Sequence, residues 1–367
     1  MRLALASNYA PDRRPLSEYA FHLAGGLRSS AGEHEMVILS GRYPAVDAPD
    51  VLRILDQASP RLPLDIVAAL RQHRVDALLF NTSFTNWGSN LTNLTGLLTP
   101  WFARRAGFRN VVTLLHHLPH TIDAARVGYR LTPLHRLAIE LGCRAVAAST
   151  VVCFTLKRDL DCFQRRYTPR NIVHVPHGLL GEPRWRPPRG EGVVLAFGRW
   201  GRAKDPEPLL RAFARTSDAT QRLIVAGPSA PSRPGFQERL ADRYASRRIT
   251  FTGYVPEDQI PDLFHSADLV VLPYKENAGL SGVLHQTCQY GRVPLMRRLE
   301  VFEEMIGDLG LTGYFYETEA ELATQMRRLL ADPARLAADG RHNFEAISAL
   351  SMDRIAPIYW QLMNAHA

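Results

Sequence analysis

Short runs of apolar and β-branched residues alternate with amphipathic helical patterns along most of the chain, and this alternation restricts the fold more than any other feature. One helical pattern covers 17–29 and another lies near 129–144. Apolar strands separated by helices form parallel βαβ units, so we predict a doubly wound α/β sheet. The runs that we expect to be its strands are 2–7, 36–40, 76–80, 110–115 and 150–154.

The alternation stops once and then starts again. Residues 176–192 (PHGLLGEPRWRPPRGEG) are rich in Pro, Gly and Arg, which sustain neither a helix nor a central strand. Strand patterns return at 193–197, 222–227, 249–253, 268–273 and 293–296. We therefore predict two Rossmann-like domains, over 1–176 and 193–350, joined by a linker over 177–192. A last helical pattern lies at 352–364, and residues 351–367 are expected to return to the N-terminal domain.

Composition excludes several classes of protein. Hydrophobic residues make up 46% of the chain and charged residues 22%, which is typical of a globular protein and not of a disordered one. The net charge of +8 comes from residues 1–185, because the remainder is neutral. The apolar run at the N-terminus is too short for a signal peptide and no run is long enough for a membrane span, so we expect a cytoplasmic protein. The cysteines, which match no zinc or redox spacing and are expected to be buried thiols, are Cys143, Cys153, Cys162 and Cys288.

The first candidate site segment is AFGRWGRAKDPEPLLRAFA (196–214). A strand pattern ends at Phe197, and Arg199 and Lys204 follow it before a helix that we expect to begin near Asp205. The carboxyl end of a strand is where open α/β sheets bind ligands. A guanidinium and an ammonium there can stabilise a departing diphosphate without a metal. Two solvated surface cations are the alternative, but Lys204 is one of only three lysines among 44 cationic residues.

The second segment is DLVVLPYKENAGLSGVLHQTCQYGRVPLM (268–296). Its strand pattern ends at Pro273 and is followed by a polar turn and a helix that stops at Gly291. A glycine-rich backbone at a helix start offers free N–H groups to phosphate. Glu276 and Gln286 can hydrogen-bond sugar hydroxyls. Many strand–turn–helix units would look similar.

The third segment, VTLLHHLPHTID (112–123), places His116, His117 and His120 just after a predicted strand, in the expected crevice. Zinc binding would need a fourth ligand that is not evident, and structural histidines are the other alternative. Asp159 and Asp161 fall within a helical pattern, and we interpret them as part of a solvated helix face. We predict no metal.

These segments together resemble glycosyltransferase family 4, the retaining nucleotide-sugar enzymes of GT-B fold. The resemblance is strongest over 193–296. GRWGRAK is similar to the family's Gly-Arg…Lys segment, FTGYVPEDQIPDLFHSADLVVLPY (251–274) to the stretch that enters the donor-binding strand, and SGVLHQTCQYGRVP to the donor loop. LLHHLPH resembles the His-bearing loop, and VPHGLL (175–180) resembles Val-Pro-Asn-Gly-Val with His177 in place of Asn.

The resemblance implies two Rossmann-like domains facing a cleft. It implies transfer of a hexose from a nucleoside diphosphate sugar to an acceptor hydroxyl, in polysaccharide or glycolipid synthesis, with no metal cofactor. Arg199 and Lys204 would hold the diphosphate, and His116 would contact the hexose, with His117 and His120 close by. The implied donor-binding residues are Glu276, Gly279, Leu280, Ser281, Gly282, Val283 and Gln286.

Two features depart from the family pattern. The two glutamates that many members carry eight residues apart fall on Ala278 and Gln286, and Glu276 replaces the first only if the loop is shifted. At the N-terminus, the family's Gly-Gly is replaced within SNYAPDRRPLSEYA (7–20). Of the Arg14, Pro15, Leu16 and Ser17 that stand there, Arg14 and Ser17 are the candidates for acceptor or sugar contacts.

Other functions and partners are compatible with the sequence. A nucleotide-sugar epimerase or hydrolase would share the fold, and so would a non-catalytic sugar- or nucleotide-binding protein. Residues 98–109 (LTPWFARRAGFR) mix aromatic residues with arginine, which suits an anionic membrane surface that carries a lipid-linked acceptor. An ordinary helix with buried aromatics is the alternative. No nucleic-acid-binding module is present, so no nucleic-acid partner is expected.

Overall fold

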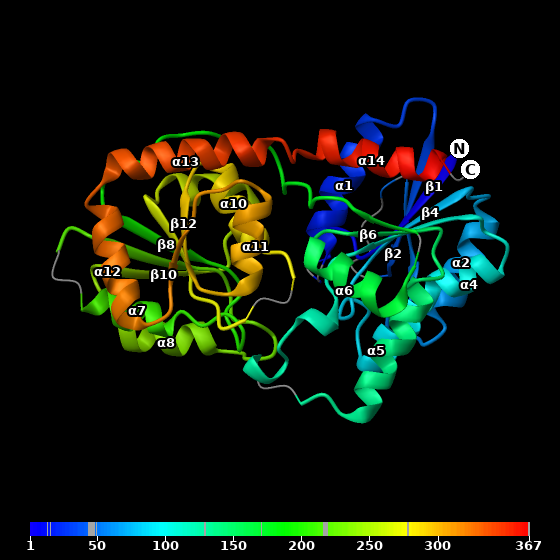
Figure 1. Cartoon of the computed structure of the whole chain (residues 1–367), viewed down its shortest axis with the longest axis horizontal. Coiled ribbons are helices and arrows are strands. Elements are labelled where there is room, and N and C mark those ends of the chain that lie inside the picture. The colour runs from blue at the N-terminus through cyan, green and yellow to red at the C-terminus, as the bar shows by residue number, and fades with distance from the viewer. Residues whose placement is uncertain are drawn as a thin grey trace.

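Two parallel sheets, each covered by helices, make up the molecule (Figure 1). The computed structural model describes residues 1–365 except Arg13, Pro15, 43–47, 49, 128–129, 170, 216–218 and 277–278. Pro15 and Ala278, which the sequence analysis considered, therefore lie outside the described residues. The predicted α/β class is confirmed.

The first sheet and its helices form the N-terminal domain. Its strand order is β3-β2-β1-β4-β5-β6-β7, and the order reverses between β1 and β4, so the crevice for a ligand is expected at their carboxyl ends. The strands are β1 (Arg2–Ala6), β2 (Glu35–Gly41), β3 (Val51–Leu55), β4 (Ala77–Thr82), β5 (Asn110–Leu115), β6 (Val151–Phe154) and β7 (Ile172–His174). The helices are α1 (Ser17–Ser29), α2 (Leu62–Gln72), α3 (Asn90–Leu97), α4 (Thr99–Arg105), α5 (Pro133–Val146) and α6 (Lys157–Tyr167), with short 3-10 turns η1 (Pro119–Thr121) and η2 (Ala125–Val127).

The second sheet and its helices form the C-terminal domain, with strand order β10-β9-β8-β11-β12-β13. Its strands are β8 (Val193–Phe197), β9 (Arg222–Ala226), β10 (Ile249–Gly253), β11 (Leu269–Leu272), β12 (Val293–Arg297) and β13 (Tyr314–Tyr316). Its helices are α7 (Glu207–Ala214), α8 (Phe236–Tyr244), α9 (Ile260–His265), α10 (Gly282–Gln289), α11 (Glu300–Asp308), α12 (Glu319–Leu330) and α13 (Pro333–Ser348), with the 3-10 turn η3 (Glu257–Gln259).

The central strands are buried on both faces, which explains their nearly continuous apolar sequences. All residues of β4, β5, β6 and β11 are buried, because helices cover both sides of each sheet. Three strands were missed by the sequence analysis. They are β3, β7 and β13, and each lies at the edge of a sheet and is partly exposed, so its pattern is weaker.

The C-terminal helix α14 (Met352–Asn364) leaves the second domain and packs on α1 of the first, as predicted (Figure 1). Its buried face contributes Ile355, Tyr359 and Trp360 to the core that also contains α1 and β1. The indole Nε1 of Trp360 donates a hydrogen bond to the carbonyl of Leu27 at 3.0 Å. A side chain at Gly26 would place its Cβ 2.8 Å from the Met352 carbonyl oxygen, so glycine permits this close contact. No helix among the described residues is long and apolar enough to span a membrane.

Candidate functional site

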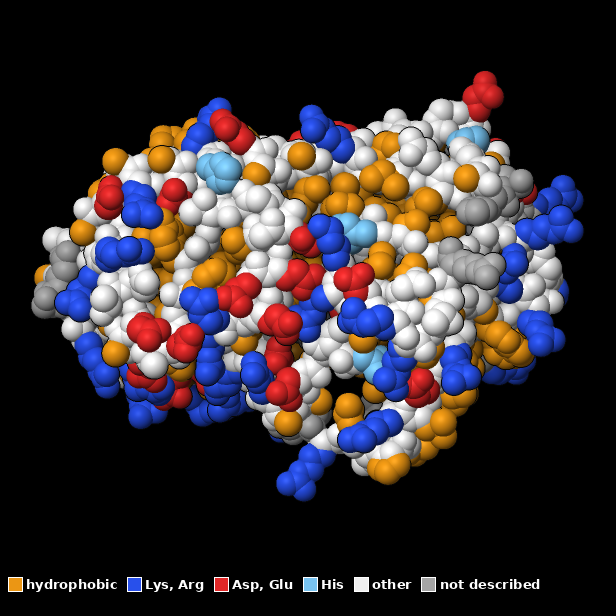
Figure 2. All heavy atoms as spheres, in the orientation of Figure 1, with side chains coloured by type: hydrophobic (Ala, Val, Ile, Leu, Met, Phe, Trp, Pro, Cys, Tyr) orange, Lys and Arg blue, Asp and Glu red, His pale blue; other side chains and the backbone are white. Residues whose placement is uncertain are grey.

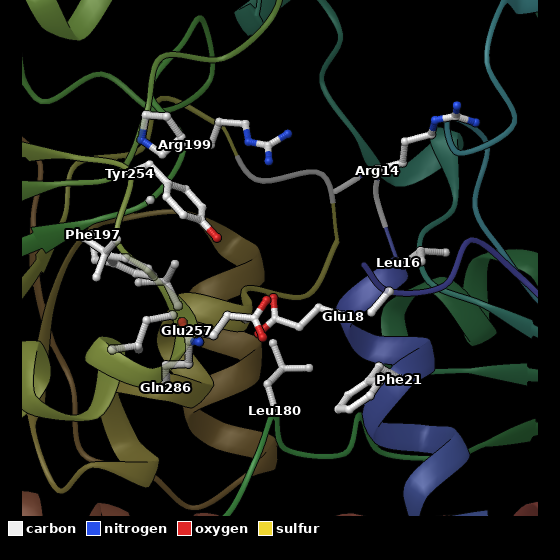
Figure 3. Close-up of a pocket in the computed structure, with 18 of the residues that line it drawn as sticks. Arg14, Leu16, Glu18, Phe21, Leu180, Phe197, Arg199, Tyr254, Glu257 and Gln286 are labelled. Atoms are coloured by element: carbon white, nitrogen blue, oxygen red, sulfur yellow. The ribbon is translucent and has the colours of Figure 1, made fainter. Parts of the chain in front are cut away.

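A cleft of about 600 Å³ lies between the two domains. One wall is formed by the loop after β1 and the start of α1, and the opposite wall by loops at the carboxyl ends of β8, β9 and β10 and by the start of α10 (Figure 3). The linker contributes Leu180. The predicted site residues that line this cleft are Arg14, Arg199, Lys204, Gly282, Val283 and Gln286.

The loop after β8 carries the two predicted diphosphate ligands. Its turn at Gly198 passes very close to Gly227, where an added Cβ would lie 1.8 Å from the Gly198 carbonyl oxygen. Arg199 extends from this wall toward the N-terminal domain (Figure 3). The ammonium of Lys204 lies 4.3 Å from the centroid of the buried Tyr274 ring, a cation–π contact that fixes the side chain beside the end of β11.

A second lysine, which the sequence analysis did not assign to the site, supports this loop. Lys275 Nζ donates to Asp205 Oδ2 at 2.6 Å, and Asp205 Oδ1 accepts from the backbone N–H of Glu207 at 3.0 Å, at the start of α7. The backbone N–H of Lys275 also donates to the carbonyl of Ala203 at 2.7 Å. Lys275 therefore fixes the segment that carries Lys204. Its rarity as a residue type was the signal in the sequence that could have identified it.

Helix α10 begins at the cleft. Ser281 caps it by accepting a hydrogen bond from the backbone N–H of Leu284 at 3.3 Å, whereas the N–H groups of Gly282 and Val283 precede the first intrahelical bonds. Gly282, Val283 and Gln286 line the cleft. The start of this helix can therefore bind a negatively charged group.

The donor loop and the His-bearing loop meet across the domain boundary. Gly279 has φ of 116°, and a Cβ there would lie 2.8 Å from Cβ of His117 and 3.0 Å from the carbonyl oxygen of His116. Two segments predicted separately are thus in contact. Glu276 is buried, and its backbone N–H donates to the carbonyl of Ala203 at 3.4 Å. Glu276, Leu280 and Ser281 do not line the cleft.

His116 lies behind the cleft and does not line it. Its Nε2 is 2.6 Å from Oδ1 of Asn81, and its ring contacts Tyr19 edge-on at 4.7 Å between centroids. Burial lowers the pKa of His116 to about 3 and that of the neighbouring His117 to about 4. Both imidazoles are therefore neutral at pH 7, and His116 can donate a hydrogen bond to Asn81 through Nε2.

Residues 191–332 match the family described as Glycosyl transferases group 1. The C-terminal domain belongs to the group 1 glycosyl transferases. The whole chain superimposes on sucrose-phosphate synthase from Thermosynechococcus elongatus with a TM-score of 0.77 and 18% identity, over 100% of both chains. The predicted GT-B fold and the resemblance to glycosyltransferase family 4 are confirmed.

The strongest sequence similarity to curated relatives covers only part of the chain. A D-inositol 3-phosphate glycosyltransferase of Rhodococcus jostii (strain RHA1) is 33% identical over 184 residues, which are 47% of this chain and 39% of the relative. The chain thus spans about two fifths of the length of that relative. A GDP-mannose-dependent alpha-(1-6)-phosphatidylinositol monomannoside mannosyltransferase of Mycolicibacterium smegmatis is 23% identical over 375 residues, or 92% of this chain and 91% of the relative.

Two of the predicted N-terminal site residues are held away from the cleft. His120 Nε2 lies 3.1 Å from Oε1 of Glu140, which also pairs with Arg166, so His120 belongs to a network on α5 and α6. Ser17 is buried at the start of α1 and does not line the cleft. Arg14 does line the cleft, and its Nε is 3.6 Å from Asp12 Oδ2.

The interpretation of Asp159 as part of a solvated helix face is wrong. Asp159 is buried, accepts hydrogen bonds from the Leu118 N–H at 3.1 Å and the Thr121 hydroxyl at 2.6 Å, and so anchors the His-bearing loop to α6. Burial raises its pKa to about 6. Among the described residues, no group of three or more His, Cys, Asp or Glu side chains is arranged to hold a metal ion.

Sequence reasoning missed several polar residues at the domain boundary. Glu18 from α1 and Glu257 from η3 both line the cleft. Burial and the charge of Glu257 raise the pKa of Glu18 to about 7. Behind the cleft, the ring of His177 lies 5.6 Å from that of His116 and 5.4 Å from that of His285. Since these residues come from different domains or from the linker, no local spacing in the sequence could indicate that they are close.

Proposed function

We propose that this protein is a retaining glycosyltransferase that moves a hexose from a nucleoside diphosphate sugar to an acceptor hydroxyl. The observation that carries the proposal is the placement of Arg199, Lys204 and the start of α10 around one interdomain cleft. Guanidinium, ammonium and backbone N–H groups are donors that bind a diphosphate. The names of the curated relatives, a GDP-mannose-dependent mannosyltransferase among them, support the same reaction class.

In this proposal the cations act where charge develops. As the bond from the anomeric carbon to the diphosphate breaks, negative charge accumulates on the diphosphate oxygens, and Arg199 and Lys204 stabilise it. The N–H groups of Gly282 and Val283 add a second set of fixed donors. The leaving diphosphate can accept the proton of the acceptor hydroxyl, so no protein nucleophile is required. The two walls of the cleft hold donor and acceptor in the geometry for reaction.

We propose further that no metal cofactor takes part. Arg199 and Lys204 supply two positive charges beside the proposed diphosphate position, which is the charge that a bound divalent cation would otherwise contribute. A transfer assay in the presence and absence of EDTA tests this point. Equal rates are expected, and a loss of activity that Mg²⁺ or Mn²⁺ restores would contradict it.

The central experiment compares Lys204→Ala and Arg199→Ala with Arg202→Ala. Arg202 is an exposed residue of the same loop that does not line the cleft, so it controls for a general loss of positive charge. Nucleoside diphosphates with different bases are first screened by thermal shift, since a ligand that binds the folded protein stabilises it. With the donor found, each of the first two substitutions is expected to lower kcat by about 10²–10³, as for loss of a preorganised donor to a developing negative charge.

Product analysis separates the alternatives. Transfer to an acceptor with an unchanged anomeric configuration supports the proposal. Release of free sugar or of an epimerised nucleotide sugar, with or without acceptor, would identify a hydrolase or an epimerase. If Lys204→Ala turns over within a few-fold of the wild type, the proposed role of Lys204 is wrong.

We also propose that the N-terminal domain meets an anionic membrane surface that carries the acceptor. In α4, Trp101 is 41% exposed with the Arg105 guanidinium 5.1 Å from its ring centroid, whereas Phe102 and Phe108 pack against the core. The support therefore comes mainly from α5, where three leucines at helical spacing are exposed: Leu134, Leu137 and Leu141. Figure 2 shows hydrophobic side chains flanked by basic ones at the edge of the molecule where α5 lies in Figure 1.

Sedimentation with liposomes tests this membrane proposal. Binding to vesicles with anionic lipid is expected to weaken as salt increases, because the arginine contribution is screened. Leu134→Ser/Leu137→Ser is expected to reduce binding, and Leu64→Ser, an exposed leucine on α2, serves as a control. Equal sedimentation of the double variant and the wild type would contradict the assignment to α5.

A further inference from the structure

Two carboxyl groups from different domains face each other in the middle of the cleft. Glu18 lies in the first turn of α1, and Glu257 is the first residue of η3. Figure 3 shows the two side chains extending from opposite walls until their carboxyl groups meet, above Leu180 of the linker. Arg199 lies toward the other end of the same cleft (Figure 3). The cleft therefore has a cationic part and an acidic part.

No cation compensates this pair within the part of the chain that the structure describes. Neither Glu18 nor Glu257 forms an ion pair, and neither carboxyl group has a hydrogen-bond partner, among the described residues. Because Glu18 is partly buried and faces another carboxylate, burial and the charge of Glu257 raise its pKa to about 7. Near neutral pH the pair therefore offers both an O–H donor and several acceptor oxygens.

A buried amide completes the group. Gln286 is 6% exposed, lines the cleft, and belongs to the helix α10 that starts there. Its side-chain amide forms no hydrogen bond with another described residue. The rest of the side chain is covered, and the amide atoms face the open space of the cleft, where a ligand or water can satisfy them. Gln286 therefore offers, independently of the two carboxyls, an unpaired polar group to a ligand in this part of the cleft.

We propose that Glu18, Glu257 and Gln286 form one site for vicinal hydroxyl groups of a sugar ring, assembled from both domains. The inference rests on the proposed function and adds residues to its site. A phosphate would be repelled by the carboxyl pair, so the anionic part of a substrate belongs at Arg199 and Lys204. Hydroxyls both donate and accept, which matches a carboxylate, a protonated carboxyl and an amide together. The hydroxyls come either from the ribose of the donor or from the acceptor.

A binding experiment with two arms separates these sources. In the first, calorimetry compares the nucleoside diphosphate that stabilises the wild type with its 2′-deoxy counterpart. In the second, the protein saturated with that nucleotide is titrated with methyl α-D-glucopyranoside, methyl α-D-mannopyranoside and myo-inositol. The variants are Glu18→Ala and Glu257→Ala, with Glu257→Gln as the conservative change. Asp258→Asn is the matched control, because Asp258 is the next residue of η3, is exposed and does not line the cleft.

Loss of a hydrogen bond to a charged group is expected to weaken binding roughly tenfold or more. If ribose occupies the site, both alanine variants bind the nucleotide that much more weakly and no longer distinguish it from the 2′-deoxy form. If the acceptor occupies it, nucleotide binding is unchanged and the sugar arm shows the loss. Glu257→Gln is expected to retain part of the affinity.

The inference and the proposed function fail in different ways. If the wild type binds nucleotide and both alanine variants match the wild type within twofold in both arms, the site is refuted while the proposed function stands. If the wild type binds no nucleoside diphosphate, the proposed function is refuted. The sugars are then titrated without nucleotide, and unaltered or absent sugar binding refutes the site as well.

Discussion

Arg292 allows a quantitative test of how the C-terminal domain is held together. Its side chain is fully buried, and its guanidinium donates to five backbone carbonyls. Nε bonds to Phe264 at 2.9 Å, and Nη2 bonds to His265 at 3.0 Å. The carbonyls that share Nη1 are those of Arg186 at 2.7 Å, Gly291 at 3.0 Å and Tyr290 at 3.1 Å. One side chain thus joins the linker, the end of α9 and the end of α10.

We expect Arg292→Met to destabilise the C-terminal domain by about 3–5 kcal/mol. Four N–H groups take part, each hydrogen bond contributes roughly 1 kcal/mol net, and the buried carbonyls lose their partners at additional cost. Burial also lowers the pKa of Arg292 to about 10, because the charged guanidinium is removed from water. Part of the lost stability is therefore recovered, because the variant no longer has to bury a charged group, and methionine is readily accommodated in an apolar interior.

Urea unfolding followed by tryptophan fluorescence measures the effect as a lower transition midpoint at constant slope. Arg297→Met is the matched control, since Arg297 ends the same strand, β12, and its side chain is exposed. A surface substitution of this kind is expected to change the free energy of unfolding by no more than about 0.5 kcal/mol. Arg292→Lys retains the charge but concentrates its donors on one nitrogen, so it is expected to recover only part of the stability. A loss below about 1 kcal/mol for Arg292→Met would refute the reasoning.

Two further predictions concern the cleft. Gly227→Ala is expected to destabilise the protein by at least about 2 kcal/mol and to abolish nucleotide binding, because the new Cβ would collide with the Gly198 carbonyl at a φ of 106°. Thermal unfolding measures the loss of stability, and the shift that a nucleotide induces measures binding. Gly253→Ala is the comparison, because its φ is also positive but its Cβ would meet no atom within 4 Å. For Glu18, the folded protein holds its proton up to about pH 7, whereas the unfolded chain loses it near 4.5. The free energy of unfolding therefore falls as pH rises between these values, by at most about 3 kcal/mol and less where solvent screens the charge. Glu18→Gln should remove this dependence in unfolding curves at pH 5.5 and 8, and an unchanged pH dependence would contradict the assignment.

The fold was accessible from the sequence wherever a strand is covered on both faces. The strands β4 and β11 appear as continuous apolar runs because no side of them meets solvent. The edge strands β3 and β13 retain partly exposed residues, and their patterns are too weak to distinguish from loops. Helices α1 and α14 were predicted with their observed bounds, since each has a single buried face with regular spacing.

Among the residues of the candidate site, too, only those that belong to a local sequence pattern could be predicted. Arg199 and Lys204 could be predicted because a strand end, a glycine turn and a helix start are local features. Gln286 was indicated by the resemblance of its segment to the family's donor loop, where it stands at the position of the second glutamate. Glu18 and Glu257 could not be paired from the sequence, because only the packing of two domains brings them together. His120 was placed correctly after a strand, but its hydrogen bond with Glu140 holds it away from the cleft.

The course of α14 has a consequence for synthesis of the protein. Strand β1 and helix α14 share one core, so the ribosome must reach residues 352–364 before residues 2–6 can finish packing. Until Trp360 emerges, the surface of α1 that it covers is exposed while the entire second domain is being made. N-terminal domains usually fold first and independently during synthesis, but this one cannot complete its folding until the C-terminal domain has been made. A premature stop after residue 350 would leave the second sheet intact and damage the first.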